Sequence, residues 1–418
     1  MPRAFAAAPW GIQPSGWSDA WEAAKGSNNA TVVGFGTSQL QAAINCTDCM
    51  NLGYFPLLRK NILGRSGTTW KGDSYPISYS TAWLAQLLGT LPWSMDTTPS
   101  AVQWVGPGFG YSWIATTGSP NLCKFTTPAN PLGAGAPTPY PQSARCWIWD
   151  PSGASGNVQY NINGGATQTA ALAGDGAFKT IVFNNLIGSA ASTINFTSQP
   201  ASTYFMPISM SVFPGPTGPA SGPGSGIFFT WWAWSAMPLH EFGRSDKTPA
   251  DRMIYWKSGS SPEFRGDLVI IDLGNDFNYY YTQNPKTINS NPTMQVYGYP
   301  PTLFHNKLQQ LANAMRSGKP PPAGSGRLGN AVSLVLSLSP FPDGIYSDVT
   351  GFGGAPQNYE TYLDIAYNFA LDKNAASING HLAVGGFGSA LQFETSSDVH
   401  LKNDGHDFMA QQLLGLGI

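Results

Sequence analysis

The feature that most constrains the fold is a change of pattern in the middle of this 418-residue chain. From about Thr97, short segments alternate apolar and polar residues and are separated by clusters of Gly, Pro, Asn and Ser. Such spacing, with no helical period, predicts an antiparallel β-sandwich. The predicted strands are Arg145–Trp149, Val158–Ile162, Phe178–Phe183, Thr193–Phe196 and Tyr204–Phe213.

This region contains one predicted turn and ends in a predicted linker. Asn163–Gly165 follows an alternating strand and predicts a tight turn, because Asn and Gly tolerate positive φ. Pro214–Gly226 has the composition of a semi-rigid linker and closes the region.

On both sides of the β region the pattern is α/β. Leu268–Leu273 is a continuous apolar run, as in parallel strands buried on both faces. Strands that alternate with helices predict a parallel, flavodoxin-like sheet, here interrupted by the sandwich. We therefore predict an α/β domain in two parts, residues 1–96 and 227–418, with an insert at 97–226. Its other predicted strands are Ala30–Gly36, Ile227–Thr230, Ala331–Leu338 and one near His381–Val384, and its helices are Pro56–Leu63, Ser80–Leu88, a segment through Leu303, Phe304, Leu308, Leu311 and Met315, Tyr359–Leu371 and about His406–Leu414.

Composition excludes several classes of function. Charged residues make up 11% of the chain, the net charge is −2, and no basic stripe exists, so nucleic-acid binding has no electrostatic support. No run of 18 apolar residues exists, so no transmembrane helix is expected. Met1–Pro9 is too short for the apolar core of a signal peptide, so we expect a leader already removed or release by another route, such as lysis.

The four cysteines favour structure over metal binding. They fall as Cys46-x-x-Cys49 and as the distant pair Cys123 and Cys146, which is not a zinc-ligand spacing. A disulfide within each pair, or four buried thiols, is expected, with no metal and no cofactor.

Ser38 is the candidate nucleophile. It stands two residues after Gly36, where the first predicted strand ends, and open α/β sheets place their sites at the carboxyl ends of strands. A serine hydroxyl needs a base and donors for an oxyanion before it can attack a carbonyl. By itself, Gly36-Thr37-Ser38 fits a helix cap or tight turn better than a nucleophile.

Two later segments supply the other groups. Asn275 follows the buried strand Leu268–Leu273 and would offer a side-chain amide at the sheet edge, although taken alone it is better explained by an Asx turn. His400 lies on a predicted loop, with Asp398 two residues before it and a helix behind it, as an oriented base does. His406 is expected at the start of that helix, in a structural role or as a residue that supports the catalytic ones.

Taken in order, these segments resemble the SGNH (GDSL-like) serine hydrolases. Gly36-Thr37-Ser38 matches the first block, with Thr37 where the family has aspartate. Gly274-Asn275-Asp276 and Asp398-Val399-His400 match two later blocks, each one residue shorter than usual. A second block resembles the segment from Gly243 to Asp246, which has Asp246 where the family usually has glycine.

The resemblance implies roles for these residues. Ser38 would be the nucleophile, His400 the base and Asp398 its orienter, and the oxyanion would be held by backbone N–H groups of Ser38, Gly243 or Asp246 and by the Asn275 amide. Tyr279 and Tyr280, just after Asn275, are candidate substrate contacts, as are several tryptophans, most of which we expect in the core.

The implied function is hydrolysis of acyl esters on a cell-envelope glycan or lipid, with the insert as a carbohydrate-binding-like module. The departures at Thr37, at Asp246 and in the shortened block that contains His400 keep an alternative open. In that alternative, the domain is catalytically inert and serves as a structural or glycan-binding part of a bacteriophage tail. The predicted location is a phage tail or the extracellular space, and other tail proteins are expected partners.

Overall fold

The computed structural model describes the main elements of both predicted parts. The described residues are 29–36, 40, 46–65, 68–76, 92–94, 102–103, 112–114, 121–133, 136, 138–150, 156–175, 177–197, 204–223, 226–233, 266–273, 286–287, 295–296, 304–306, 308–309, 312–313, 333–338, 356–373, 375–383 and 401–418.

A parallel sheet forms the centre of the molecule. Its strands lie in the order β2-β13-β1-β14-β17-β18, and every neighbouring pair among them is parallel. All five residues of β14 are buried, as expected for a strand covered on both faces. The strands are β1 (Asn29–Gly36), β2 (Trp70–Pro76), β13 (Gly226–Ala233), β14 (Leu268–Asp272), β17 (Ser333–Leu338) and β18 (Ala376–Asn379).

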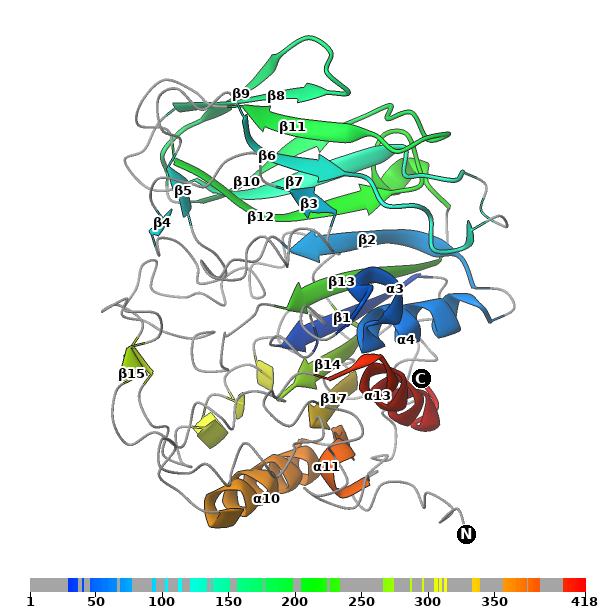
Figure 1. Cartoon of the computed structure of the whole chain (residues 1–418), viewed down its shortest axis with the longest axis vertical. Coiled ribbons are helices and arrows are strands. Elements are labelled where there is room, and N and C mark those ends of the chain that lie inside the picture. Colours follow the sequence, from blue (N-terminus) through cyan, green and yellow to red (C-terminus); the bar gives the residue numbers. More distant parts are fainter. Residues whose placement is uncertain are drawn as a thin grey trace.

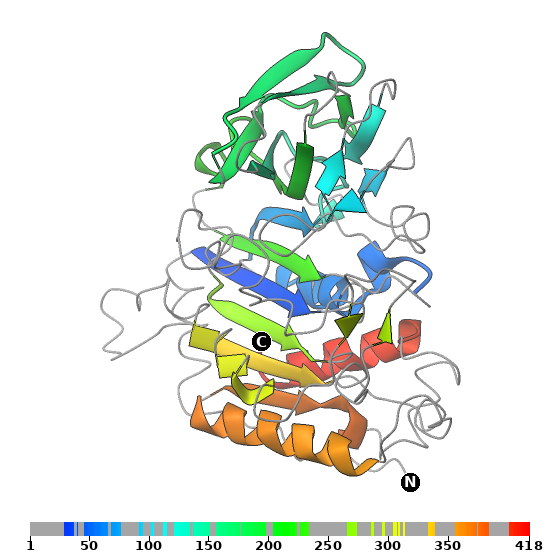
Figure 2. The same ribbon diagram turned by 90° about the vertical axis from the view of Figure 1, so that its left-hand side faces the viewer.

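Helices pack beside this sheet in two groups. α4 contacts β13 and α13, while α10 contacts β17 and β18 at the far end of the sheet (Figures 1 and 2). α4 ends at Leu63, with Gly64 directly after it, as predicted, but begins two residues before Pro56. The helices are α3 (Cys49–Leu52), α4 (Tyr54–Leu63), α10 (Pro356–Asp372), α11 (Gly380–Ala383) and α13 (Asn403–Gly415).

One predicted strand is wrong. His381 was expected in a strand, but it lies in the short helix α11, and the strand β18 precedes it. β18 carries only small and polar residues beside one isoleucine, so it lacks the β-branched and aromatic enrichment that marks a strand in sequence. Burial of all four residues stabilises it instead.

The insert consists of two packed antiparallel layers. One is a five-stranded sheet in the order β3-β6-β11-β8-β9, and the other contains β10, β7 and β12. Aromatic side chains join them, since Phe183 of β10 meets Phe196 of β11 and Tyr160 of β8, with ring centroids 6.1 and 5.0 Å apart. The strands are β3 (Trp93–Ser94), β4 (Val102–Gln103), β5 (Ser112–Ile114), β6 (Asn121–Thr126), β7 (Ser143–Asp150), β8 (Gly156–Ile162), β9 (Gln168–Leu172), β10 (Ala177–Phe183), β11 (Thr193–Thr197) and β12 (Tyr204–Phe213), and a two-stranded ribbon of β15 (Lys286–Thr287) and β16 (Gln295–Val296) lies outside the insert.

All five strands predicted for the insert are confirmed, and so is its tight turn. Asn163 and Gly164 have φ of 53° and 71°, and the Gly165 N–H donates to the Ile162 carbonyl. Two consecutive positive φ angles fit the right-handed twist of the flanking strands.

The insert shares a sheet with the α/β domain. β2 pairs with β13 in parallel on one side and with β12 antiparallel on the other, so one continuous sheet crosses from the insert into the parallel strands (Figure 1). The predicted boundary between residues 96 and 97 lies outside the described residues, and β3, just before it, pairs with β6 of the insert.

The segment after β12 is bonded to the insert. Ser143 of β7 donates its hydroxyl to the Gly215 carbonyl and accepts from the Gly218 N–H, and Asn185 N–H donates to the Pro216 carbonyl. These bonds hold much of the proline- and glycine-rich connection against the sandwich.

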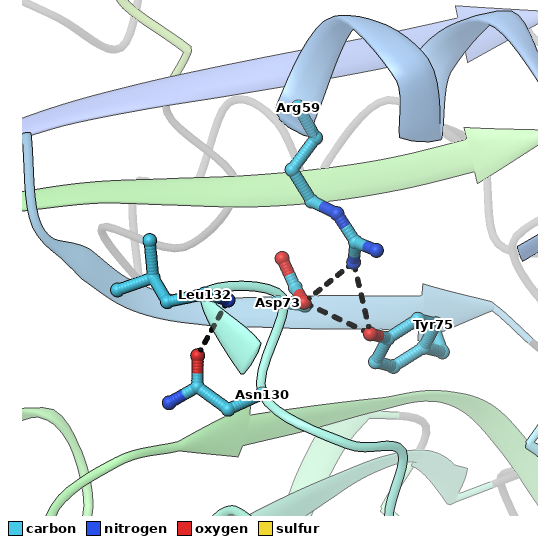
Figure 3. Close-up of polar contacts among 5 residues, drawn as sticks. All are labelled: Arg59, Asp73, Tyr75, Asn130 and Leu132. Atoms are coloured by element: carbon cyan, nitrogen blue, oxygen red, sulfur yellow. Dashed lines mark hydrogen bonds and ion pairs between the residues drawn. The ribbon is translucent and has the colours of Figure 1, made fainter. Parts of the chain in front are cut away.

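A buried ion pair lies where the insert and the α/β domain meet. Arg59 of α4 donates to the Asp73 carboxylate at 2.8 Å and to the Tyr75 hydroxyl at 3.2 Å, and that hydroxyl donates to Asp73 at 2.9 Å (Figure 3). Tyr75 also contacts Phe125 of β6, and its carbonyl accepts from the Trp93 indole. We call Arg59, Asp73 and Tyr75 the junction cluster.

The four cysteines are buried thiols. Cys46, Cys49, Cys123 and Cys146 all fall within the described residues, and none forms a disulfide. This matches one of the two arrangements expected from the sequence. Burial raises the pKa of the Cys146 thiol. No helix in the described ranges is long and apolar enough to cross a membrane.

Candidate active site

Every residue predicted for the site lies outside the described residues. These residues are Ser38, Gly243, Asp246, Asn275, Tyr279, Tyr280, Asp398 and His400. The structure does place the chain on both sides of Ser38, before Asn275 and after His400. The geometry of these flanking segments is therefore what bears on the site.

The nucleophile segment is fixed at both ends. Gly36 is the last residue of β1, and Leu40 is fully buried with its carbonyl accepting a 3.0 Å bond from the Trp231 indole of β13. Ser38 is two residues from each, so covalent geometry keeps its Cα within about 7.6 Å of both. Trp231 is buried, which places this tryptophan in the core as expected.

Close packing beneath the segment requires glycine. A Cβ on Gly34 would lie 2.7 Å from the Phe55 ring of α4, and one on Gly36 would lie 2.6 Å from the Asp272 Cβ. Both approaches are too short for a side chain. The glycines thus let α4 and β14 press against the last residues of β1.

The predicted oxyanion asparagine follows the neighbouring strand. β1 and β14 are parallel, with Phe35 opposite Ile271, so both strands finish at the same edge of the sheet. Asp272 ends β14, and covalent geometry keeps the Cα of Asn275 within about 11 Å of it. At the opposite end of the pair, Asp267 accepts a 2.8 Å bond from the Thr31 N–H, which fixes the register.

The predicted base precedes the last helix. Leu401, directly after His400, is fully buried, and α13 begins at Asn403. Asn403 is tied to Thr47, since its amide oxygen accepts from the Thr47 N–H and its NH₂ donates to the Thr47 hydroxyl. The chain after His400 is therefore bonded to the chain that follows Ser38.

Tyr54 joins this helix to the sheet edge. Its ring stacks on His406 in the first turn of α13, with centroids 6.1 Å apart and planes inclined by 28°. Burial, followed by the charge of Asp272, raises the pKa of Tyr54 well above its usual value, and the hydroxyl of Ser337 opposes the shift. The Tyr54 hydroxyl therefore faces Asp272 and Ser337, at the carboxyl ends of β14 and β17.

The predicted position of His406 is confirmed. It lies in the first turn of α13 and is 1% exposed. Tyr54, Asp272 and Ser337 were missed by the sequence analysis. Only Asp272 carried a signal, because an acidic residue that ends a continuous apolar run is buried at a strand end and so needs a polar environment.

Comparison with known proteins identifies the fold. Neither a protein-family model nor a curated protein matches the sequence. Among solved structures, the chain is similar to "Peptidoglycan O-acetylesterase in action, 5 min", with a TM-score of 0.54 and 14% identity over 98% of this chain and 95% of that one. The chain has the SGNH hydrolase fold. The resemblance inferred from four short motifs is thereby confirmed at the level of the fold.

Two further similarities are too distant to carry an argument. One is to a carbohydrate esterase family 2 enzyme with a carbohydrate-binding domain from Corynascus thermopiles (Myceliophthora fergusii), with TM-score 0.29 and 14% identity over 76% of this chain and 98% of that one. The other is to a lipase/acylhydrolase from Enterococcus faecalis, with TM-score 0.31 and 10% identity over 46% and 75%.

Proposed function

We propose that this SGNH-fold protein is a serine esterase that removes acyl groups from a cell-envelope glycan or lipid. The observation that supports it most is the convergence of the three flanking segments on one edge of the sheet. Gly36 and Leu40 bracket Ser38, Asp272 precedes Asn275 on the adjoining strand, and Leu401 follows His400. Open α/β sheets bind their ligands at this edge.

The proposed reaction proceeds through an acyl-enzyme. His400, oriented by Asp398, takes the Ser38 proton while the Ser38 Oγ attacks the ester carbonyl carbon, and the alcohol leaves with a proton from His400. Backbone N–H groups of Ser38 and of Gly243 or Asp246, with the Asn275 amide, stabilise the oxyanion. A water molecule then hydrolyses the acyl-enzyme, again with His400 as base.

The comparison suggests the first substrate to test. One solved protein that shares this fold along nearly the whole chain is a peptidoglycan O-acetylesterase by its name. O-acetylated peptidoglycan is therefore the substrate we propose, and Tyr279 and Tyr280 are proposed contacts for it. Action on this substrate implies a place outside the bacterial cytoplasm, as a secreted enzyme or as part of a phage tail.

Labelling with a fluorophosphonate tests the proposal. The wild type is expected to label and to release acetate from O-acetylated peptidoglycan, while Ser38→Ala and His400→Ala lose both, with a fall in kcat of roughly 10⁴-fold or more. Thermal unfolding of each variant shows that the fold is intact.

Absence of labelling in the wild type, together with retained binding to O-acetylated peptidoglycan, would refute the esterase. That pair of results would favour an inert glycan-binding domain in its place.

A further inference from the structure

Four polar side chains form a buried group at the carboxyl edge of the sheet. Tyr54 and Ser337 are 0% exposed, and Asp272 and His406 are 1% exposed. Asp272 and Ser337 are register partners on β14 and β17, so their side chains point to the same face of the sheet. We call these four residues the edge cluster.

The edge cluster contains a residue from each of the segments that lie next to Ser38, Asn275 and His400 in the sequence or pack against them. Asp272 stands three residues before Asn275 and packs against Gly36, two residues before Ser38. His406 stands six residues after His400, and Tyr54 opens the first long helix after Ser38. Tyr54 touches both other segments, with its ring on His406 and its hydroxyl toward Asp272.

Among the described residues, two hydroxyls of this group lack a full hydrogen-bond partner, as does the buried Ser209 hydroxyl of β12. Within the described part of the chain, neither the Tyr54 Oη nor the Ser337 Oγ makes a hydrogen bond of ordinary geometry, although both are fully buried. Burying a hydroxyl without a full partner lowers the stability of the folded state. A phenylalanine at position 54 would fill the same space without that cost, so packing alone does not account for the tyrosine.

We propose that Tyr54 is a positioning residue of the hydrolase site, which links the strand end before Asn275 and the helix turn after His400 to the helix that follows Ser38. This inference rests on the proposed function. Precise spacing of nucleophile, base and oxyanion donor controls the rate, since a misplacement of about 1 Å costs up to about 10²-fold. Tyr54 touches no substrate in this scheme and acts through the segments that it holds.

Tyr54→Phe separates positioning from packing. The variant keeps the ring and its stacking on His406 but removes the hydroxyl. We expect kcat for an acetyl ester such as p-nitrophenyl acetate to fall about tenfold or more. KM should stay within about twofold, and the thermal midpoint should be unchanged or higher, because the buried hydroxyl is lost.

Tyr75→Phe is the matched control. It also removes one buried tyrosine hydroxyl, but that hydroxyl is bonded to Arg59 and Asp73 and lies in the junction cluster. We expect a lower thermal midpoint and a kcat within about twofold of the wild type. Tyr54→Phe should thus lower kcat without lowering the thermal midpoint, and Tyr75→Phe should lower the thermal midpoint without lowering kcat.

A double-mutant cycle adds a second readout. Asp272→Asn keeps the shape of the side chain but removes its charge, and it should also lower kcat. If the edge cluster acts as a unit, the double variant with Tyr54→Phe will be about as slow as the slower single variant. If the losses of kcat in the two single variants multiply in the double variant, the inference is overturned. A kcat in Tyr54→Phe within twofold of the wild type would overturn it as well.

Ser38→Ala, measured alongside, keeps the two proposals distinct. Loss of labelling in Ser38→Ala with full kcat in Tyr54→Phe overturns the positioning role alone. Labelling that survives in Ser38→Ala overturns the proposed function itself.

Discussion

The edge cluster and the junction cluster each take one residue from α4, Tyr54 at its first position and Arg59 five residues later, and they differ in how their polar groups are bonded. In the junction cluster, Arg59, Asp73 and Tyr75 bond to one another in a closed triangle, and only the Arg59 Nε and the Asp73 Oδ1 make no hydrogen bond within the described residues. In the edge cluster, Tyr54 and Ser337 lie buried within the described residues without bonds of ordinary geometry. α4 therefore carries a charged side chain bonded to its partners toward the insert, and a tyrosine hydroxyl without a hydrogen bond of ordinary geometry toward the predicted site.

This difference predicts that one cluster mainly contributes to stability and the other mainly to activity. A paired, buried charge is costly to break, because removing one partner leaves the other without compensation. An incompletely paired group lowers stability, and such groups concentrate where a structure holds a functional geometry. The comparison therefore predicts stability losses from changes at the junction and rate losses from changes at the edge.

The largest loss of stability is expected from Arg59→Met. The substitution keeps an unbranched apolar stem but leaves the Asp73 carboxylate, which is 3% exposed, without its cation. A loss of about 3–5 kcal/mol in the free energy of unfolding is expected, measured by urea denaturation. Lys179→Met is the control, because its ion pair with Asp175 lies on the surface, and no measurable change is expected.

The activity of folded Arg59→Met sharpens the test. Because Arg59 belongs to the junction, kcat at low temperature should remain within about twofold of the wild type. A folded variant with a tenfold lower kcat would contradict the division between the two clusters.

A smaller loss of stability, together with a loss of rate, is expected from Gly36→Ala. The added methyl group would meet the Asp272 Cβ at 2.6 Å, so β1 and β14 must separate at the sheet edge. Overpacking of this kind costs about 1–3 kcal/mol. Because the same shift moves the segment of Ser38, kcat should fall by up to about 10²-fold.

Gly415→Ala is the matched control for this substitution. An added Cβ there meets nothing within 4 Å, at the end of α13, so stability should be equal or slightly higher and kcat unchanged. Equal rates in Gly36→Ala and the wild type would place the edge cluster outside the catalytic geometry.

The smallest effect expected is on the pH dependence of stability. Burial, with the charge of Asp73, raises the pKa of Tyr75 above its value in the unfolded chain. As the pH rises, the Tyr75 hydroxyl therefore ionises in the unfolded chain first, above about pH 10. The contribution of Tyr75 to the free energy of unfolding is complete below that pH and falls as the pH rises above it. Urea denaturation from pH 7 to 11 should show Tyr75→Phe less stable at neutral pH, with the gap to the wild type narrowing above pH 10. A constant gap would mean that Tyr75 ionises alike in both states.

Local pattern predicted much of this fold. The five insert strands follow from alternation, β14 from its apolar run, and α4 from proline near its start and glycine after its end. β18 was misplaced because small residues in a buried parallel strand carry no period. β2 was not predicted at all, because its Lys, Asp, Gly and Pro oppose a strand assignment, and its two flanking strands stabilise it.

The site was predictable only as separate segments. Ser38, Asn275 and His400 each stand at a recognisable strand end or helix start, and order along the chain related them to a known family. Tyr54, Asp272, Ser337 and His406 come together only through tertiary packing across hundreds of residues. Their spacing in sequence carries no period, so no local pattern relates one to another.

The pairing of β2 with β12 limits how the insert can be removed or exchanged. Without residues 97–226, the segment Asp73–Pro76 of β2 would present unpaired N–H and C=O groups to other chains, which is a template for aggregation. The insert thus caps the sheet as well as extending it. A protein built this way is inherited as one piece, because exchanging the insert for an unrelated module would require a new strand to complete the same edge.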